Sequence, residues 1–106
     1  MVAGPYRSGA AGRAANLRAL NEAALAVFRR GHLPVIGVNL ALPIIEAAGP
    51  ESFDEIMMPV SLAVAERCDA VLRIGGPSGG ADEEVERFRE RGLPVFHGLD
   101  EIPAAG

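Results

Sequence analysis

One stretch of the sequence decides the expected fold: Arg73-Ile74-Gly75-Gly76-Pro77-Ser78-Gly79-Gly80-Ala81-Asp82-Glu83-Glu84-Val85. It begins as the end of an apolar run, continues through a loop with four glycines and passes into an acidic helix start. This pattern is typical of a strand, a tight turn and a helix N-terminus. In open α/β sheets, ligands bind outside the carboxyl ends of the strands, where helix N-termini offer backbone N–H groups to anions. We therefore expect this loop to hold a nucleotide-like ligand.

Alternating strands and helices are expected on either side of this loop. Short apolar runs predict strands at residues 1–3, 33–38, 70–74 and 93–96. Apolar residues at helical spacing predict helices at 13–30, from a capping box at Ser52-x-x-Glu55 to about residue 67, and at 81–91. Residues 39–50 are too apolar for a solvated loop and are expected to form a loop or short helix that covers the sheet or a partner subunit. The alternation predicts one α/β domain, residues 1–106, with a flavodoxin- or Rossmann-like three-layer fold and a four- or five-stranded parallel sheet.

Composition narrows the class of ligand. The net charge is −4, all ten basic residues are arginine, and aromatic residues are few, so a nucleic acid polymer is a poor candidate partner. Cys68 is the single cysteine, which favours a reducing, cytoplasmic setting. No apolar run approaches membrane-spanning length and no signal peptide precedes Met1, so no membrane association is expected. The sequence has no metal-ligand spacing, P-loop or dinucleotide fingerprint, and we expect neither a metal nor a cofactor.

The acids that open the third helix differ in where helical geometry places them. Val85 and Phe88 define the buried face, Glu83 points almost opposite to it, and Glu84 lies on its flank. Glu84 is therefore the acid expected to be half-buried near the mouth of the sheet. The alternative is that all these acids only complement the helix dipole.

Two segments together resemble the nucleoside 2-deoxyribosyltransferase superfamily, which includes 2′-deoxynucleoside 5′-monophosphate N-glycosidases and small uncharacterised relatives. They are Val2-Ala3-Gly4-Pro5-Tyr6-Arg7 and Cys68-Asp69-Ala70-Val71…Ser78-x-Gly80-x-x-x-Glu84-Val85. The matching motifs occur in the same order and at similar spacing over nearly the whole chain. The resemblance implies hydrolysis or transfer at the N-glycosidic bond of a small-molecule nucleoside or nucleotide. Relatives are dimers or larger, so it also implies a homodimer or higher homo-oligomer, with the apolar segment 40–48 as a plausible interface.

The resemblance also assigns roles to individual residues. Glu84 matches the nucleophile that attacks the anomeric carbon, and a helix N-terminus is expected to help keep it ionised. Ser78 matches a contact to the 5′-phosphate, which the backbone N–H groups of Gly79 and Gly80 and the side chain of Arg7 would share. The remaining substrate-binding positions are Gly4, where the first strand approaches the sugar, and Tyr6, beside the base. Ordinary alternatives are a partly buried loop tyrosine and a surface arginine.

One departure from the family pattern concerns the acid that protonates the departing base. Ser61 stands at that position and has no suitable pKa, while Asp54 or Glu55 lies further back as a possible substitute. Asp69 and His32 are expected at the opposite edge of the sheet, and His97 at the same edge as the loop. A non-catalytic nucleotide-binding or sensing module therefore remains an alternative. A cytokinin-activating type of phosphoribohydrolase ranks lower, because its loop carries a threonine and is one residue shorter.

Overall fold

A three-stranded parallel sheet lies at the centre of the structure, a computed structural model that describes residues 1–105. The strands β1 (Val2–Ala3), β2 (Val71–Arg73) and β3 (Val95–Phe96) lie side by side in that order. Val2 is paired with Leu72, and Leu72 with Phe96. The helices are α1 (Arg13–Arg29), α2 (Gly37–Ala48), α3 (Phe53–Ala65) and α4 (Gly79–Glu90), with 3-10 turns at Pro50–Ser52 and Leu99–Glu101.

The expected four- or five-stranded, Rossmann-like sheet is wrong. The described chain is mostly helical, and its sheet has only three short strands. Residues 33–36 run beside β1 as irregular backbone, with one hydrogen bond from the Val2 N–H to the Val35 carbonyl (2.8 Å). Pro34 offers no N–H to a ladder, and α2 already begins at Gly37, so the expected second strand is cut short at both ends. A continuous apolar run does not distinguish a buried strand from the start of a buried helix.

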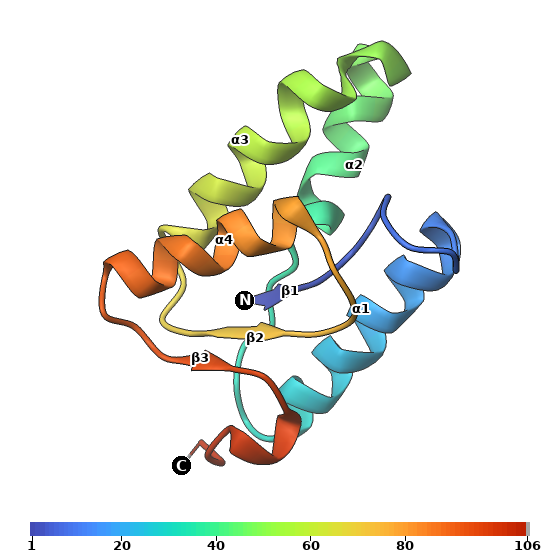
Figure 1. Ribbon diagram of the computed structural model, residues 1–106. Coiled ribbons are helices and arrows are strands. Elements are labelled where there is room, and N and C mark those ends of the chain that lie inside the picture. Colours follow the sequence, from blue (N-terminus) through green and yellow to red (C-terminus); the bar gives the residue numbers. More distant parts are fainter. Residues whose placement is uncertain (106) are drawn as a thin grey trace.

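Helices cover both faces of the sheet (Figure 1). Val2 and Leu72 point into a core shared with Leu20 of α1. Val71, the neighbour of Leu72, points into a second core with Phe88 of α4, which is fully buried. Successive strand residues thus serve opposite faces, and the sheet holds α1 and α4 apart.

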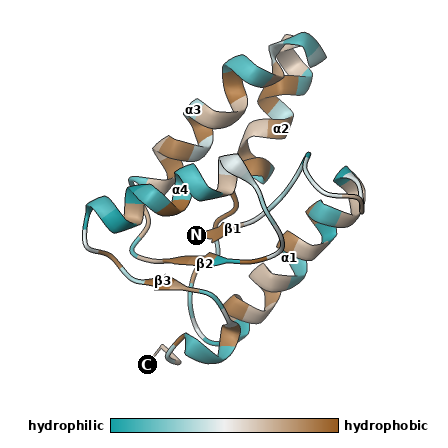
Figure 2. Ribbon diagram, in the orientation of Figure 1, coloured by the Kyte–Doolittle hydropathy of each residue, from teal (hydrophilic) through white to brown (hydrophobic). Residues whose placement is uncertain are grey.

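The helices α2 and α3 pack against each other as a pair that extends beyond the sheet (Figure 1). Their close approach depends on Gly37, because a Cβ there would lie 2.5 Å from the Oγ of Ser61. The predicted capping box does not form in the described chain, since Ser52 belongs to the 3-10 turn and makes no side-chain capping bond. Many residues of this pair are apolar (Figure 2), and on α2 Leu40 and Ile44 are half-exposed. No helix within residues 1–105 has both the length and the apolar character needed to cross a membrane.

Candidate functional site

A cavity of about 260 Å³ opens at the carboxyl ends of β1 and β2, between α3, α4 and the loops that follow the two strands. The loops are joined to each other. The Ser8 hydroxyl donates a hydrogen bond to the Pro77 carbonyl (3.0 Å), and Pro5 packs against Gly75, whose φ of +77° suits glycine. This is the edge of the sheet at which the sequence predicted a ligand site.

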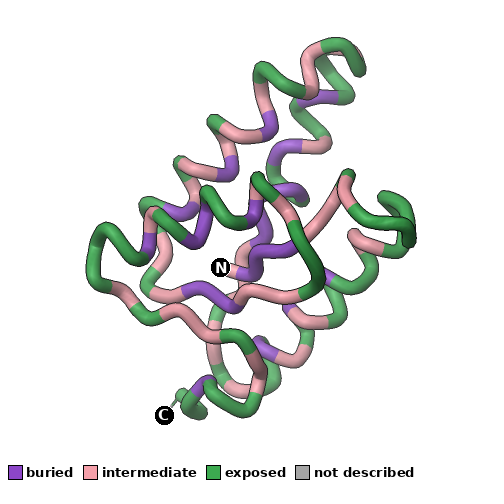
Figure 3. The backbone as a smooth tube through the Cα atoms, viewed as in Figure 1, coloured by how far each residue is buried: buried purple, intermediate pink, exposed green. Residues whose placement is uncertain are grey.

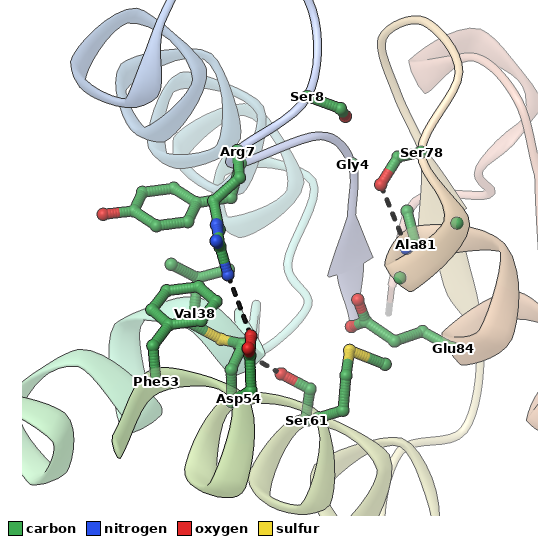
Figure 4. Close-up of a pocket in the computed structure, with 15 residues that line it drawn as sticks. Gly4, Arg7, Ser8, Val38, Phe53, Asp54, Ser61, Ser78, Ala81 and Glu84 are labelled. Carbon is green, nitrogen blue, oxygen red and sulfur yellow. Dashed lines mark hydrogen bonds and ion pairs between the residues drawn. The ribbon is translucent and has the colours of Figure 1, made fainter. Parts of the chain in front are cut away.

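All the site residues predicted from the sequence line this one cavity (Figure 4). They are Gly4, Tyr6, Arg7, Ser78, Gly79, Gly80 and Glu84. The lining also includes residues that the sequence pattern did not point to: Ser8, Val38, Phe53, Met57, Met58 and Ala81. Ser61 and Asp54, named only in connection with the missing acid, also belong to the lining.

Glu84 is buried, with 7% of its surface exposed, and its carboxylate points into the cavity (Figure 4). None of residues 1–105 donates a hydrogen bond to this carboxylate. Burial raises the pKa of Glu84 from its usual 4.5 to about 7, and the positive charge of Arg73 opposes part of that rise. The helix N-terminus was expected to keep Glu84 ionised, but the effect of burial on its pKa is larger. Glu84 lies in the second turn of α4, where the dipole has faded, and desolvation dominates.

The start of α4 is arranged to receive an anion. The Ser78 hydroxyl oxygen caps the helix by accepting a hydrogen bond from the Ala81 N–H (3.2 Å), which leaves the hydroxyl hydrogen able to donate elsewhere. Gly79 and Gly80 are the first two helical residues, so their N–H groups have no acceptor inside the helix. Helix α4 begins two residues earlier than predicted, which places both glycines within its first turn.

Arg7 and Tyr6 are held together at the mouth of the cavity. The Arg7 guanidinium forms an ion pair with Asp54 (3.0 Å) and lies 4.2 Å from the centre of the Phe53 ring. The Tyr6 ring is stacked on the same Phe53 at 6.2 Å with an angle of 9°. A phosphate that binds Arg7 would therefore have to displace Asp54 or share the guanidinium with it.

Gly4 has a packing role that is independent of any ligand. A Cβ at this position would lie 2.8 Å from Cγ1 of Ile74 and 3.2 Å from Cδ2 of Leu20. The strand end thus needs a glycine to fit between the neighbouring strand and α1, whether or not a sugar approaches it.

One face of α3 lines the cavity and shows which acid could protonate the departing base. Asp54, Met57, Met58 and Ser61 follow each other at helical spacing and all line the cavity, whereas Glu55 lies outside the lining. Ser61 is almost fully buried, and its hydroxyl is directed at the Met57 sulfur (3.8 Å). Of the two substitutes that the sequence left open, only Asp54 reaches the cavity, where it is exposed and paired with Arg7. The i, i+3, i+4, i+7 spacing was the signal that could have identified this face.

The histidines lie away from this cavity. The backbone N–H of His97 donates to a carboxylate oxygen of Glu101 (3.2 Å), and the His32 ring makes a 2.6 Å hydrogen bond to the Pro103 carbonyl. His32, Cys68 and Asp69 line a second cavity of about 430 Å³ at the opposite edge of the sheet, as the sequence predicted for His32 and Asp69. Among residues 1–105, no cluster of three or more His, Cys, Asp or Glu side chains could hold a metal ion.

Comparison with known proteins leaves the family open. No protein-family model matches the chain, and searches of curated proteins and of solved structures find no significant match.

Proposed function

We propose that this chain acts on the N-glycosidic bond of a (deoxy)nucleoside or its 5′-monophosphate, with Glu84 as the nucleophile. The resemblance to the nucleoside 2-deoxyribosyltransferase superfamily suggests this reaction. The observation that carries the proposal is a buried carboxylate that points into a cavity, with hydrogen-bond donors suited to a phosphate at the start of the same helix, α4. The cavity is slightly smaller than a typical drug-sized site, which fits a sugar phosphate with its base extending toward the open mouth.

In the proposed reaction, ionised Glu84 attacks the anomeric carbon while the bond from that carbon to the base nitrogen breaks. The bonding electrons leave with the base, which takes up a proton, and a glycosyl ester forms on Glu84. Water, or the nitrogen of a second base, then attacks the same carbon and releases the carboxylate. Because the transition state carries positive charge on the sugar, a carboxylate with few other partners interacts strongly with it.

The phosphate would bind at the start of α4. The Gly79 and Gly80 N–H groups and the Ser78 hydroxyl would donate hydrogen bonds to the phosphate. The Arg7 guanidinium would add a positive charge once its ion pair with Asp54 is broken. Tyr6 and Phe53 offer aromatic surface to the base at the cavity mouth.

The test is to incubate the protein with each deoxynucleoside monophosphate and to measure free base by chromatography. Base release by the wild type that is lost in Glu84→Gln supports the proposal. Glu83→Gln is the matched control, because Glu83 is the neighbouring acid on the same helix and is exposed. The proposal fails if no substrate is cleaved, or if Glu84→Gln cleaves as fast as the control.

A second candidate function is a nucleotide-binding or sensing module without turnover. Ser61 favours it, because a buried serine replaces the expected acid and the remaining acid, Asp54, is exposed and ion-paired. Calorimetry would then show binding of a nucleoside monophosphate, while chromatography shows no free base.

The proposed assembly is a homodimer or higher homo-oligomer in the cytoplasm. Half-exposed Leu40 and Ile44 on α2 support an interface there, and the free thiol of Cys68 supports a reducing compartment. Light scattering at micromolar concentration should give a mass of at least two chains, and the mass of one chain would contradict the dimer.

A further inference from the structure

Arg73 occupies an unusual place in the turn between β2 and α4. It is the last residue of β2, and only 11% of its side chain is exposed. Its guanidinium bends back along its own chain, where Nη1 donates to the Ile74 carbonyl and Nη2 donates to the Gly76 carbonyl (2.9 Å). Nε and Nη2 also donate to one carboxylate oxygen of Asp82 at 3.3 and 3.2 Å. A single side chain thus connects the strand end, the glycine loop and the first turns of α4.

The loop has little other packing at its centre. A Cβ at Gly76 would meet no described heavy atom within 4 Å, so this part of the turn is open. Glycines of this kind leave the backbone flexible unless hydrogen bonds fix it. The contacts of Pro5 and Ser8 hold the two ends of the loop, and Arg73 holds the part between them.

We propose that Arg73 is a positioning residue that fixes the glycine loop and the start of α4, so that the phosphate donors and Glu84 face the same substrate. This inference rests on the proposed function for the identity of the ligand. A planar guanidinium with several fixed donors is needed, because a lysine ammonium cannot reach two carbonyls and a carboxylate with the same geometry.

The charge of Arg73 gives the role a signature that a purely structural residue would lack. Arg73 approaches Glu84 from β2 and the Met1 amino group does so from β1, and both lower the pKa that burial raises. Among the residues of α3 that line the cavity, Asp54 is the charged one, and it stands with Arg7 at the mouth, while Glu55 lies outside the lining. Removal of the Arg73 charge should therefore raise the pKa of Glu84 further, whereas a lysine should preserve it.

The experiment compares Arg73→Gln, Arg73→Lys and the control Arg89→Gln, which removes an exposed arginine of α4. For each protein, three quantities are measured: the pH profile of base release, the titration of the Glu84 carboxyl by ¹³C NMR, and the hydrogen exchange of the Ala81 and Asp82 backbone amides, which donate to Ser78 at the start of α4. We expect Arg73→Lys to lower kcat/KM roughly 10- to 100-fold and to speed amide exchange, with the pH midpoint nearly unchanged. Arg73→Gln should show the same losses and also move the midpoint to higher pH.

Several outcomes would overturn the inference. Arg73→Lys with wild-type kcat/KM and amide exchange would show that the clamp is not needed. If Arg73→Gln does not fold, Arg73→Lys and Asp82→Asn still test the contacts separately, and wild-type exchange in both would refute the role. If the wild type releases no base at all, the proposed function fails, while amide exchange and the binding of inorganic phosphate still decide the role of Arg73.

Discussion

The two edges of the sheet carry two very different cavities. The cavity at the amino ends of the strands is the larger, at about 430 Å³ against 260 Å³, and it contains a cysteine, a histidine and an aspartate. Two of its polar groups have partners, since His32 contacts the Pro103 carbonyl and the Met1 amino group donates to the Ala70 carbonyl, and its carboxylate, Asp69, is exposed to solvent. The cavity at the carboxyl ends has a buried carboxylate and helix-start N–H groups without partners in residues 1–105. The two cavities therefore differ less in volume or residue type than in burial: the acid without a partner in residues 1–105 is buried in one, and exposed to water in the other.

The largest expected effect comes from exchanging one acid in each cavity. Glu84→Gln should lower base release on the order of 10³-fold or more, because the amide cannot act as the nucleophile. Asp69→Asn, in the other cavity, should leave the rate unchanged. The measurement is base release by chromatography for both variants. Equal rates would contradict the assignment of the reaction to the cavity at the carboxyl ends of the strands.

The second prediction concerns the dependence of stability on pH. Glu84 has a folded pKa of about 7, above its unfolded value of 4.5, so the folded state binds the proton more tightly. Its contribution is complete below the unfolded pKa and is lost as the pH rises through 7, a change on the order of 3 kcal/mol. Urea unfolding at pH 5 and at pH 8.5 should show this loss in the wild type and much less of it in Glu84→Gln. A wild-type stability that rises over this interval would contradict the burial argument.

Activity should follow the opposite trend from stability. The nucleophile has to be ionised, so the rate of base release should rise with pH around a midpoint near 7. A rate that is flat between pH 6 and 8 would show that the ionisation of Glu84 does not control the reaction.

A smaller effect is expected from the serines that precede two helices. Ser78 caps α4 through the Ala81 N–H, whereas Ser52 makes no comparable bond within the described chain. Ser78→Ala should cost about 1 kcal/mol of stability and also weaken phosphate binding, while Ser52→Ala should change neither. Thermal unfolding and calorimetry with inorganic phosphate measure the two effects, and equal behaviour of both variants would be inconsistent with the structure.

The smallest effect is expected at the cavity mouth. Asp54→Asn removes the carboxylate that competes for Arg7, so phosphate affinity should increase a few-fold, in line with the modest strength of exposed ion pairs at about 0.2–1 kcal/mol. Glu55→Gln is the control because Glu55 lies outside the lining. Weaker phosphate binding by Asp54→Asn would mean that Asp54 orients Arg7 rather than competing for it.

The sequence predicted which residues lie together better than it predicted the number of strands. Ser78, Gly79 and Glu84 lie on one strand-loop-helix unit, so short-range spacing was enough to place them around one cavity. The number of strands depended on whether residues 33–38 pair along their length, which a continuous apolar run does not reveal. The spacing of residues could not predict the pKa of Glu84 either, because its desolvation depends on side chains from α3 that are distant in sequence.

The close approach of Gly37 and Ser61 limits how this chain can change. In Figure 3, buried positions recur between exposed ones along both α2 and α3. Both residues are buried where α2 meets α3, and the Ser61 side chain occupies the space that a Cβ at position 37 would need. An aspartate at position 61 would add volume and a charge at that point, so the two helices would have to separate or the backbone of α2 would have to shift. Positions 37 and 61 should therefore be inherited as a pair. Any attempt to engineer an acid into this wall of the cavity has to redesign the start of α2 at the same time.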